Sequence, residues 1–440
     1  PDGSTVLFQV TNYDLLTEAR ATNIWSVPAS GGDPVQLTTE GGSGAQWIEN
    51  GARIAFIAGG KVMAMNPDGT GKKEITGLND FEILSFSPAG DKVYFTRRVK
   101  LDQTANEKYG LSNAKVRIID DLMYRHWDYW HDYSYSHLFT ASFDGAAISN
   151  EKDIMEGQHF DAPDAPWFDA ADIAWSPDGK YIAYACKKLT GKAYSLSTNT
   201  DIYLYDVTTG EEINITEGNM GYDKTPLFSP DGTMIAYSSM EEGGYESDLE
   251  RLFVYNIASG ERKWVSQGWD YNVASIQWNG TGEIWFTSPY LGRQPVFRIS
   301  MADGAVTKVT EGDYDMGSLQ LRNNTLVAGI QSMARPTEVA KVDMADGQFS
   351  MITDVNGHIY ESIKMGQSEE RYIKTKDGKD LQLWIIYPPD FDPAKKYPAL
   401  LYCKGGPQGP LGQSWSYRWN YQMMAANGYI VVAVNRRGNS

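Results

Sequence analysis

Hydrophobic and polar residues alternate over short stretches along most of this chain. From the start to about residue 355, strings such as ARIAFIA, DKVYFTR, KYIAYAC, TMIAYSS and EIWFTS each follow a turn rich in Gly, Asp or Asn. Asp-Gly between alternating residues is a hairpin signal, because glycine readily adopts the left-handed conformation that such turns need. The pattern therefore predicts short antiparallel strands joined by tight turns.

A second kind of string recurs between the first ones. Examples are NIWSVPASGGDPVQLT, DIYLYDVTTGEEINIT, RLFVYNIASGERKWVS and PVFRISMADGAVTKVT, and seven strings of each kind occur. Most repeat at intervals of roughly 40 to 50 residues, and units of this length with four strands apiece are typical of a β-propeller. We expect a mostly β fold with about seven blades over residues 1–355, or eight if one blade lies upstream.

One interval between these strings is much longer than the others and covers residues 99–137. Loops of this length inside compact repeats are usually functional or disordered. Its aromatic residues favour an ordered surface, either a lid packed on the next blade or a functional contact surface; they are Trp127, Tyr129, Trp130, Tyr133 and Tyr135. His126, His131 and His137 are spaced by five and six residues, which fits no helical pair of ligands, so no metal site is expected.

The pattern changes after Asp354. Residues 368–402 are expected to form a hairpin, a crossover rich in Pro and Asp, and then a strand. The apolar runs Ala399–Tyr402 and Tyr429–Val434 are continuous and are separated by a helix-sized interval that starts near Trp415. Continuous runs predict strands buried on both faces of a parallel sheet. The sequence thus predicts a propeller over residues 1–355 and the start of an α/β domain over residues 356–440.

Composition excludes several classes of protein. The net charge of −17 and the pI near 4.8 argue against a nucleic-acid or anionic-membrane partner. Two cysteines, Cys186 and Cys403, exclude a disulfide framework and a thiolate metal site, and no cofactor is indicated. No apolar run approaches the roughly 18 residues of a membrane span. The chain opens in mid-pattern on Pro-Asp-Gly-Ser, and with a signal peptide presumed upstream we expect a periplasmic or secreted protein, with a cytoplasmic one left open.

The glycine pair Gly405-Gly406 follows the first apolar run of the α/β region. It is either an ordinary β–α turn or a turn whose backbone N–H groups point at a developing oxyanion. The longer strings YCKGGPQ, RWNYQMMAANGYIVV and NRRG resemble the prolyl oligopeptidase family of serine peptidases, in its dipeptidyl peptidase 5 and acylaminoacyl peptidase branch. Lys404 stands where that branch usually has histidine, which leaves the backbone donors and replaces the side-chain donor.

The resemblance implies a propeller that caps an α/β-hydrolase domain. On that basis the expected activity is a serine exopeptidase that releases dipeptides from the amino terminus of oligopeptides, with oxyanion donors around Lys404, Gly405 and Gly406. The sequence contains no complete G-x-S-x-G, and all five histidines precede the glycine pair. The nucleophile, acid and base are therefore expected after residue 440, and residues 1–440 alone are expected to be inactive.

The resemblance also implies a carboxylate that binds the substrate's amino group. The string MEEGGYESDLERL at residues 240–252 resembles the family's propeller segment, where an acidic residue follows Gly-Tyr. Glu246 and Asp248 are the first candidates, and Arg125 and Asp121 of the long interval come next. The alternative is that this is simply a solvated acidic loop.

Three other functions stay open at this point. An acylaminoacyl peptidase or an oligopeptidase could use the same fold, and it would lack a carboxylate placed for the substrate ammonium. A periplasmic propeller that only binds a partner is the third, but it would close after its last blade rather than begin a parallel sheet. An oligopeptide is the expected partner, and the sequence leaves a homodimer open.

Overall fold

A computed structural model describes residues 2–111, 113–114, 116–119, 121–405 and 409–437. The chain divides into two compact units. The first unit contains Leu7–Ser26 and Val35–Val265. The second unit contains Asp2–Val6, Val27–Pro34 and Ser266–Ser440.

Five antiparallel sheets of three or four strands lie among the described residues as far as residue 264, besides the two-stranded hairpin described below. The first sheet has three strands: β1 (Thr5–Tyr13), β2 (Arg20–Pro28) and β3 (Val35–Gln36). The second and third each have four strands: β4 (Ser43–Ile48), β5 (Arg53–Ala58), β6 (Lys61–Met65) and β7 (Lys73–Glu74); then β8 (Leu84–Phe86), β9 (Lys92–Lys100), β12 (Ser134–Phe143) and β13 (Ile148–Asp153). The fourth and fifth are β14 (Ile173–Trp175), β15 (Tyr181–Cys186), β16 (Asp201–Asp206) and β17 (Glu212–Asn214); then β18 (Asp223–Phe228), β19 (Met234–Ser239), β20 (Arg251–Asn256) and β21 (Arg262–Trp264).

Two further sheets of the same kind belong to the second unit. They are β22 (Ala274–Asn279), β23 (Glu283–Thr287), β24 (Val296–Ser300) and β25 (Val306–Lys308); then β26 (Asp315–Arg322), β27 (Thr325–Ser332), β28 (Arg335–Val342) and β29 (Phe349–Met351). In each of these seven sheets, strands that are consecutive along the chain within that sheet are hydrogen-bonded neighbours. Seven such sheets in series agree with the predicted number of blades.

The Pro-Asp-Gly turns join strands as the sequence predicts. In the turn between β14 and β15, the Ser176 hydroxyl donates to Asp178 Oδ1 at 2.6 Å, and the same oxygen accepts the Lys180 N–H at 3.0 Å. Gly179 completes the turn with φ of +67°, which favours glycine. Ser229, Asp231 and Thr233 repeat this arrangement between β18 and β19. A recurring sequence motif thus produces a recurring hairpin.

Packing between neighbouring sheets buries their faces. In the first unit, Val93 and Phe95 of the third sheet pack in one cluster with Ile48 and Val62 of the second. Further clusters join the first sheet to the second, the third to the fourth and the fourth to the fifth. In the second unit, one cluster joins the sixth and seventh sheets. Each sheet's apolar side chains therefore depend on a neighbour for burial.

The last sheet of the second unit is of a different kind. Its order is β30 (Ser368–Lys374), β31 (Asp380–Ile386), β33 (Ile430–Val434) and β32 (Ala399–Tyr402). β32 and β33 are parallel, with Ala399 opposite Ile430, which confirms the predicted parallel pair. Two short helices, α3 (Gly357–Tyr360) and α4 (Tyr421–Ala426), accompany it. No helix among the described residues is long and apolar enough to cross a membrane.

Two details of this region differ from the prediction. β32 is the edge strand, and its side chains alternate between exposed and half-buried, with Leu401 62% exposed. The prediction of burial on both faces was therefore wrong for β32, because Leu400 and Tyr402 pack on the core while the described residues leave the face with Ala399 and Leu401 uncovered. The helix begins at Tyr421, six residues later than the predicted interval. The domain boundary near residue 355 stays a prediction.

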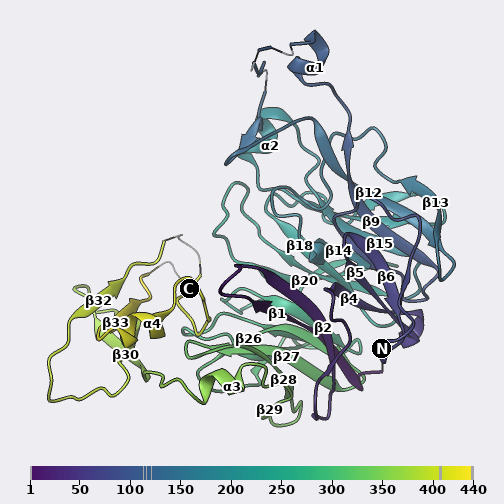
Figure 1. The fold of residues 1–440 in the computed structure, drawn as a ribbon. Helices are drawn as coiled ribbons and strands as arrows, with labels where there is room; N and C mark the ends of the chain where they lie inside the picture. The colour runs from purple at the N-terminus through teal and green to yellow at the C-terminus, as the bar shows by residue number, and fades with distance from the viewer. Residues whose placement is uncertain (1, 112, 115, 120, 406–408, 438–440) are drawn as a thin grey trace. The chain divides into compact units, whose positions relative to one another are not determined.

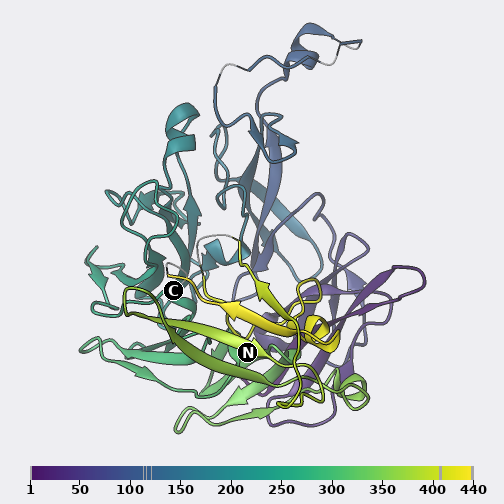
Figure 2. The same ribbon diagram turned by 90° about the vertical axis from the view of Figure 1, so that its left-hand side faces the viewer.

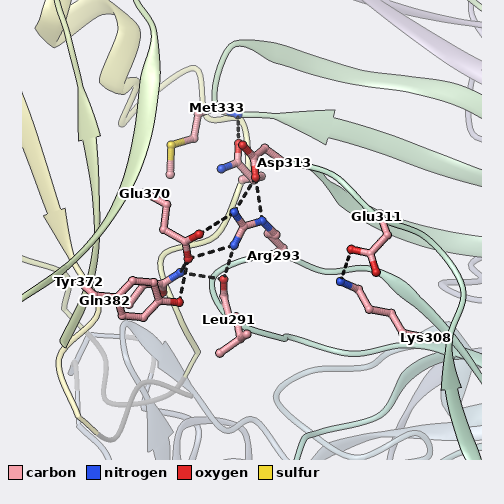
Figure 3. Close-up of polar contacts among 10 residues, drawn as sticks. Leu291, Arg293, Lys308, Glu311, Asp313, Met333, Glu370, Tyr372 and Gln382 are labelled. Atoms are coloured by element: carbon pink, nitrogen blue, oxygen red, sulfur yellow. Dashed lines mark hydrogen bonds and ion pairs between the residues drawn. The ribbon is translucent and has the colours of Figure 1, made fainter. Parts of the chain in front are cut away.

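Arg293 links the turn before β24 to the β30–β31 hairpin within the second unit (Figure 3). Its Nη2 donates to Glu370 Oε2 at 2.9 Å, and its Nε donates to Asp313 Oδ1 at 2.8 Å. Its guanidinium also lies 4.8 Å from the centroid of the buried Trp384 ring. The Arg293 side chain is only 19% exposed, so these ion pairs are less screened by water than surface pairs.

We expect Arg293→Met to destabilise the second unit by about 1–3 kcal/mol, because it leaves the half-buried Glu370 without its cation. The midpoint of thermal unfolding should fall by roughly 3–8 °C. The matched control is Arg298→Met, since Arg298 is 42% exposed and lies 3.4 Å from Glu283. That surface pair is worth about 0–1 kcal/mol. Equal shifts for the two variants, measured by differential scanning calorimetry, would contradict the assignment.

Candidate functional site

A cavity of about 1620 Å³ lies in the first unit. Most of its lining comes from four stretches of chain: the interval between β9 and β12, the segment before β14, the stretch that follows β15, and the loop before β20. Glu82, Arg98, Tyr135 and Tyr222 add to it. Two of these stretches carry short helices, α1 (Ala105–Tyr109) and α2 (Gly191–Leu196), which lie at the same end of this unit (Figure 1, Figure 2). The cavity is thus lined mainly by segments that connect the strands of the propeller sheets.

The long interval forms an ordered aromatic wall of the cavity. It contains the hairpin β10 (Arg125–His126) and β11 (Tyr129–Trp130). Two cations lie against the Trp130 ring, with the guanidinium of Arg117 at 4.1 Å and that of Arg125 at 5.2 Å from its centroid. Trp127 is 76% exposed. Such cation–π contacts hold the hairpin while its other side chains remain available to a ligand.

The structure brings three of the four predicted amine-site residues to this cavity. Glu246, Arg125 and Asp121 line it, and Asp248 does not. Asp248 instead accepts the backbone N–H groups of Glu241 at 2.6 Å and Glu242 at 2.9 Å. It also forms an ion pair with Arg251 at 3.2 Å. Asp248 therefore stabilises its own loop, and its carboxylate is already satisfied.

Glu246 is exposed and its carboxylate is available. Among the described residues, no donor lies within hydrogen-bonding distance of the Glu246 side chain. Burial, followed by the negative charge of Glu246, raises the pKa of Tyr222 to about 12. Tyr222 and Glu246 both line the cavity, so the carboxylate acts electrostatically on the cavity wall. A free carboxylate in this position can bind a cation such as an ammonium group.

Asp121 holds the long interval against α2. Its Oδ1 accepts the N–H of Leu122 at 2.8 Å. Its carboxylate lies over Gly191, which has φ of +59°, and any Cβ at that position would collide with it. The contact explains why glycine begins α2, and it leaves one face of the Asp121 carboxylate on the cavity.

Sequence reasoning missed Asp161 and Lys187, which also line the cavity. Asp161 accepts the Ser136 N–H at 2.7 Å and lies 3.5 Å from Arg98, and burial raises its pKa. Asp164 lies next to this wall and is 3% exposed, and burial raises its pKa to about 7. The string DAPDAP contains both acids and lacks a strand pattern, and this signal could have singled them out. Lys187 carries no comparable signal.

The predicted oxyanion region lies in the second unit, after β32. Lys404 Nζ donates to the carbonyl oxygen of Gly409 at 2.5 Å, and burial, with Arg436 nearby, lowers the pKa of Lys404. Gly405 does not adopt the left-handed conformation, and a Cβ there would meet none of the described atoms within 4 Å. Gly406 lies outside the described residues. The role of Gly405 and Gly406 as donors stays a prediction.

The histidines of the long interval take separate roles. His137 is buried, with Nδ1 2.7 Å from Asp153 Oδ2 and Nε2 2.8 Å from the Gln158 carbonyl oxygen. His131 Nδ1 accepts the N–H of Tyr133. Over the described part of the chain, no group of three His, Cys, Asp or Glu residues could hold a metal ion.

Known proteins share this architecture. The model of the TolB beta propeller domain matches residues 171–367. Solved structures resemble the whole chain: Pyrococcus horikoshii acylaminoacyl peptidase has a TM-score of 0.77 at 19% identity, with 99% of this chain and 64% of that one covered. Porphyromonas gingivalis dipeptidyl peptidase 4 has a TM-score of 0.55 at 16% identity, covering 99% and 63% of the two chains. The fold is a β-propeller followed by the first strands of an α/β-hydrolase domain, as predicted.

Curated relatives are more similar in sequence. The dipeptidyl-peptidase 5 of Porphyromonas gingivalis is 42% identical over the full length of this chain, which covers 65% of that relative. The dipeptidyl-peptidase 5 of Aspergillus fumigatus is 29% identical over 74% of this chain and 48% of its own length. The chain thus spans just under two thirds of the length of the most similar relative described here.

We expect Asp164→Asn to change how stability depends on pH. Burial raises the pKa of Asp164 to about 7 in the folded chain from its ordinary value of 3.8, so unfolding releases a proton between these pH values. The Asp164 contribution to stability is therefore fully present below pH 3.8 and is lost as the pH rises to 7. The variant lacks this loss, so its stability relative to wild type should rise by roughly 1–4 kcal/mol from pH 4 to pH 7.

The measurement is urea unfolding of both proteins at several pH values. Asp178→Asn is the control. Burial raises the pKa of Asp178, but hydrogen bonds from the Ser176 hydroxyl and the Lys180 N–H outweigh it, so its pKa lies below the ordinary value and it does not titrate between pH 4 and pH 7. A difference between Asp164→Asn and wild type that stays flat from pH 4 to pH 7 would show that Asp164 titrates normally.

Proposed function

Because this chain belongs to the prolyl oligopeptidase family, we propose that it supplies the propeller and the start of the catalytic domain of a serine exopeptidase. The proposed enzyme releases dipeptides from the amino terminus of oligopeptides. The observation that carries this proposal is the free carboxylate of Glu246 on a cavity large enough for a peptide end. The similarity to dipeptidyl-peptidase 5 supports the same activity.

Recognition of a free amino terminus needs a carboxylate that is not already neutralised. Glu246 meets this condition, whereas Asp248 is bound by two backbone N–H groups and Arg251. A substrate ammonium at Glu246 would form a charge-assisted hydrogen bond, which is worth more than a neutral one. Asp161 also lines the cavity, but it accepts the Ser136 N–H and lies 3.5 Å from Arg98, so it does not meet the condition. Glu246 would therefore hold the amine in place while the peptide bond is cleaved.

Bond cleavage itself is assigned to residues after 440. We assign the oxyanion turn to the segment around Gly405, where backbone N–H groups would stabilise the charge of the tetrahedral intermediate. Lys404 Nζ donates to Gly409, so its side chain supports this turn rather than replacing the family's histidine as a donor. The nucleophile, general base and acid follow in the proposed complete enzyme.

The second candidate is an acylaminoacyl peptidase. It is favoured by the similarity in fold to the Pyrococcus horikoshii enzyme and by the aromatic wall, which could take up a blocked amino terminus. A blocked terminus carries no charge and gains nothing from Glu246. Free and N-acetylated substrates therefore separate the two candidates.

We expect Glu246→Gln to lower kcat/KM for a free-amine substrate such as Ala-Ala-p-nitroanilide. The loss should be roughly 10-fold to 100-fold, because a charge-assisted hydrogen bond is removed. The measurement uses the protein extended through its catalytic domain, and N-acetyl-Ala-Ala-p-nitroanilide is the second substrate. Glu242→Gln is the matched control, since Glu242 is an exposed acid of the same loop that does not line the cavity. An enzyme that prefers the acetylated substrate would overturn the dipeptidyl assignment.

A further inference from the structure

Lys187 is a buried cation on the cavity wall. It directly follows β15, is only 7% exposed and lines the cavity. Its ammonium lies 4.4 Å from the centroid of the Tyr194 ring, which lines the same cavity. An ammonium removed from water loses strong hydration, so it is costly unless acceptors replace that water. The Tyr194 face offers some attraction but no hydrogen-bond acceptor in line with the N–H bonds.

Within the described part of the chain, no acceptor lies within hydrogen-bonding distance of Lys187 Nζ and no carboxylate lies within ion-pair distance. The next residue shows the contrast. Lys188 Nζ lies 2.5 Å from Glu212 Oε1 and 3.8 Å from the centroid of the Tyr203 ring. Two adjacent lysines thus differ in one respect: Lys188 has its carboxylate within the fold, and Lys187 does not.

Acidic groups nevertheless surround Lys187 at longer range. Burial lowers the pKa of Lys187, while the negative charges of Asp164 and Glu246 oppose this. Asp164 Oδ1 is itself buried without a hydrogen-bond partner among the described residues. The fold therefore keeps a cation beside the cavity without closing an ion pair on it. Its three N–H bonds are available to a molecule in the cavity.

The other cations on this cavity have an acceptor or are exposed to water. Arg98 is 3.5 Å from Asp161 and donates to the Ser134 carbonyl oxygen at 2.8 Å, and Arg125 donates to the Trp127 carbonyl oxygen at 2.5 Å. Arg117 stacks on Trp130 and is exposed, so water can hydrate its guanidinium. Lys187 is thus the cation of this wall that most lacks an acceptor. The acceptor that best compensates a buried ammonium is a carboxylate, because it supplies both charge and hydrogen bonds.

We propose that Lys187 binds a carboxylate of the cavity's ligand, opposite the ammonium that Glu246 binds. This inference rests on the proposed function and adds a second recognition element to it. A peptide ligand has two sources of such a group: the C-terminal carboxylate of a released dipeptide and the side chain of an acidic first residue. A zwitterionic dipeptide would then be retained as product, and an acidic first residue would be preferred as substrate.

The test is isothermal titration calorimetry on this 440-residue chain with four ligands in two matched pairs. Ala-Ala is compared with Ala-Ala amide, which lacks the terminal carboxylate. Glu-Ala amide is compared with Gln-Ala amide, which lacks the side-chain carboxylate. We expect the charged member of at least one pair to bind roughly 10-fold to 100-fold more tightly than the neutral one. The pair that shows the gain identifies the source of the carboxylate.

Variants test whether Lys187 causes the tighter binding of the ligand that carries the carboxylate. Lys187→Met should abolish this difference in affinity. Lys188→Met is the matched control that should keep the difference, because Lys188 does not line the cavity. Circular dichroism checks that both variants fold, and Lys187→Gln replaces Lys187→Met if the latter does not. Equal binding within both pairs by the wild-type chain overturns the inference, as does a gain that survives loss of Lys187.

Failure of the proposed function gives a different result. N-acetyl-Ala-Ala amide is the fifth ligand, and it lacks both charges. If it binds as tightly as Ala-Ala amide, the cavity does not recognise an amino terminus and the exopeptidase proposal fails. If Ala-Ala amide binds more tightly but neither carboxylate adds affinity, only the role of Lys187 fails.

Discussion

Burial of sheet faces against the next sheet is the constraint on which the first unit depends. Each sheet has three or four short strands, and an isolated sheet of that size gains little stability in water. Clusters such as the one that joins Tyr94 and Leu138 to Ile182 and Tyr184 supply the missing partner face. Because most strand side chains are buried in this packing, few of them can contact a ligand. The cavity is accordingly built mostly from connecting segments.

Charged side chains in and around this cavity fall into two groups: those already paired within the fold, and those that can still bind a ligand. Asp248 and Lys188 are close in sequence to Glu246 and Lys187, yet both have partners within the fold. Glu246 and Lys187 face the cavity without such partners among the described residues. Lys187 is buried, and an unpaired buried ammonium costs stability, so a ligand carboxylate that pairs with it would explain its position. Glu246 is exposed and costs little in this way, but its carboxylate is free to bind a cation. The same reasoning explains why Lys404, bonded to Gly409, is assigned a supporting role.

The sequence predicts local structure well because hairpin chemistry is local. Ser176, Asp178 and Gly179 carry the turn in five residues, and the repeat of such motifs predicts the number of sheets. Burial of β32 was predicted wrongly, because a run of apolar residues does not reveal whether one or both faces of its sheet are covered. From the sequence, Glu246 and Asp248 are the first candidates for the amine site, and Arg125 and Asp121 come next. The sequence could not show which carboxylate is already satisfied, since that depends on backbone N–H groups folded back onto Asp248.

The long interval between β9 and β12 leaves the sheet around it undisturbed. These two strands pair without a break from Lys92 opposite Ser142 to Lys100 opposite Ser134. The loop therefore begins and ends at neighbouring positions, and its length adds only a slowly growing entropic cost to folding. Natural variation can replace the aromatic wall of the cavity without repacking the third sheet. In this architecture, the choice of ligand can diverge among descendants of one ancestor while the scaffold is inherited intact.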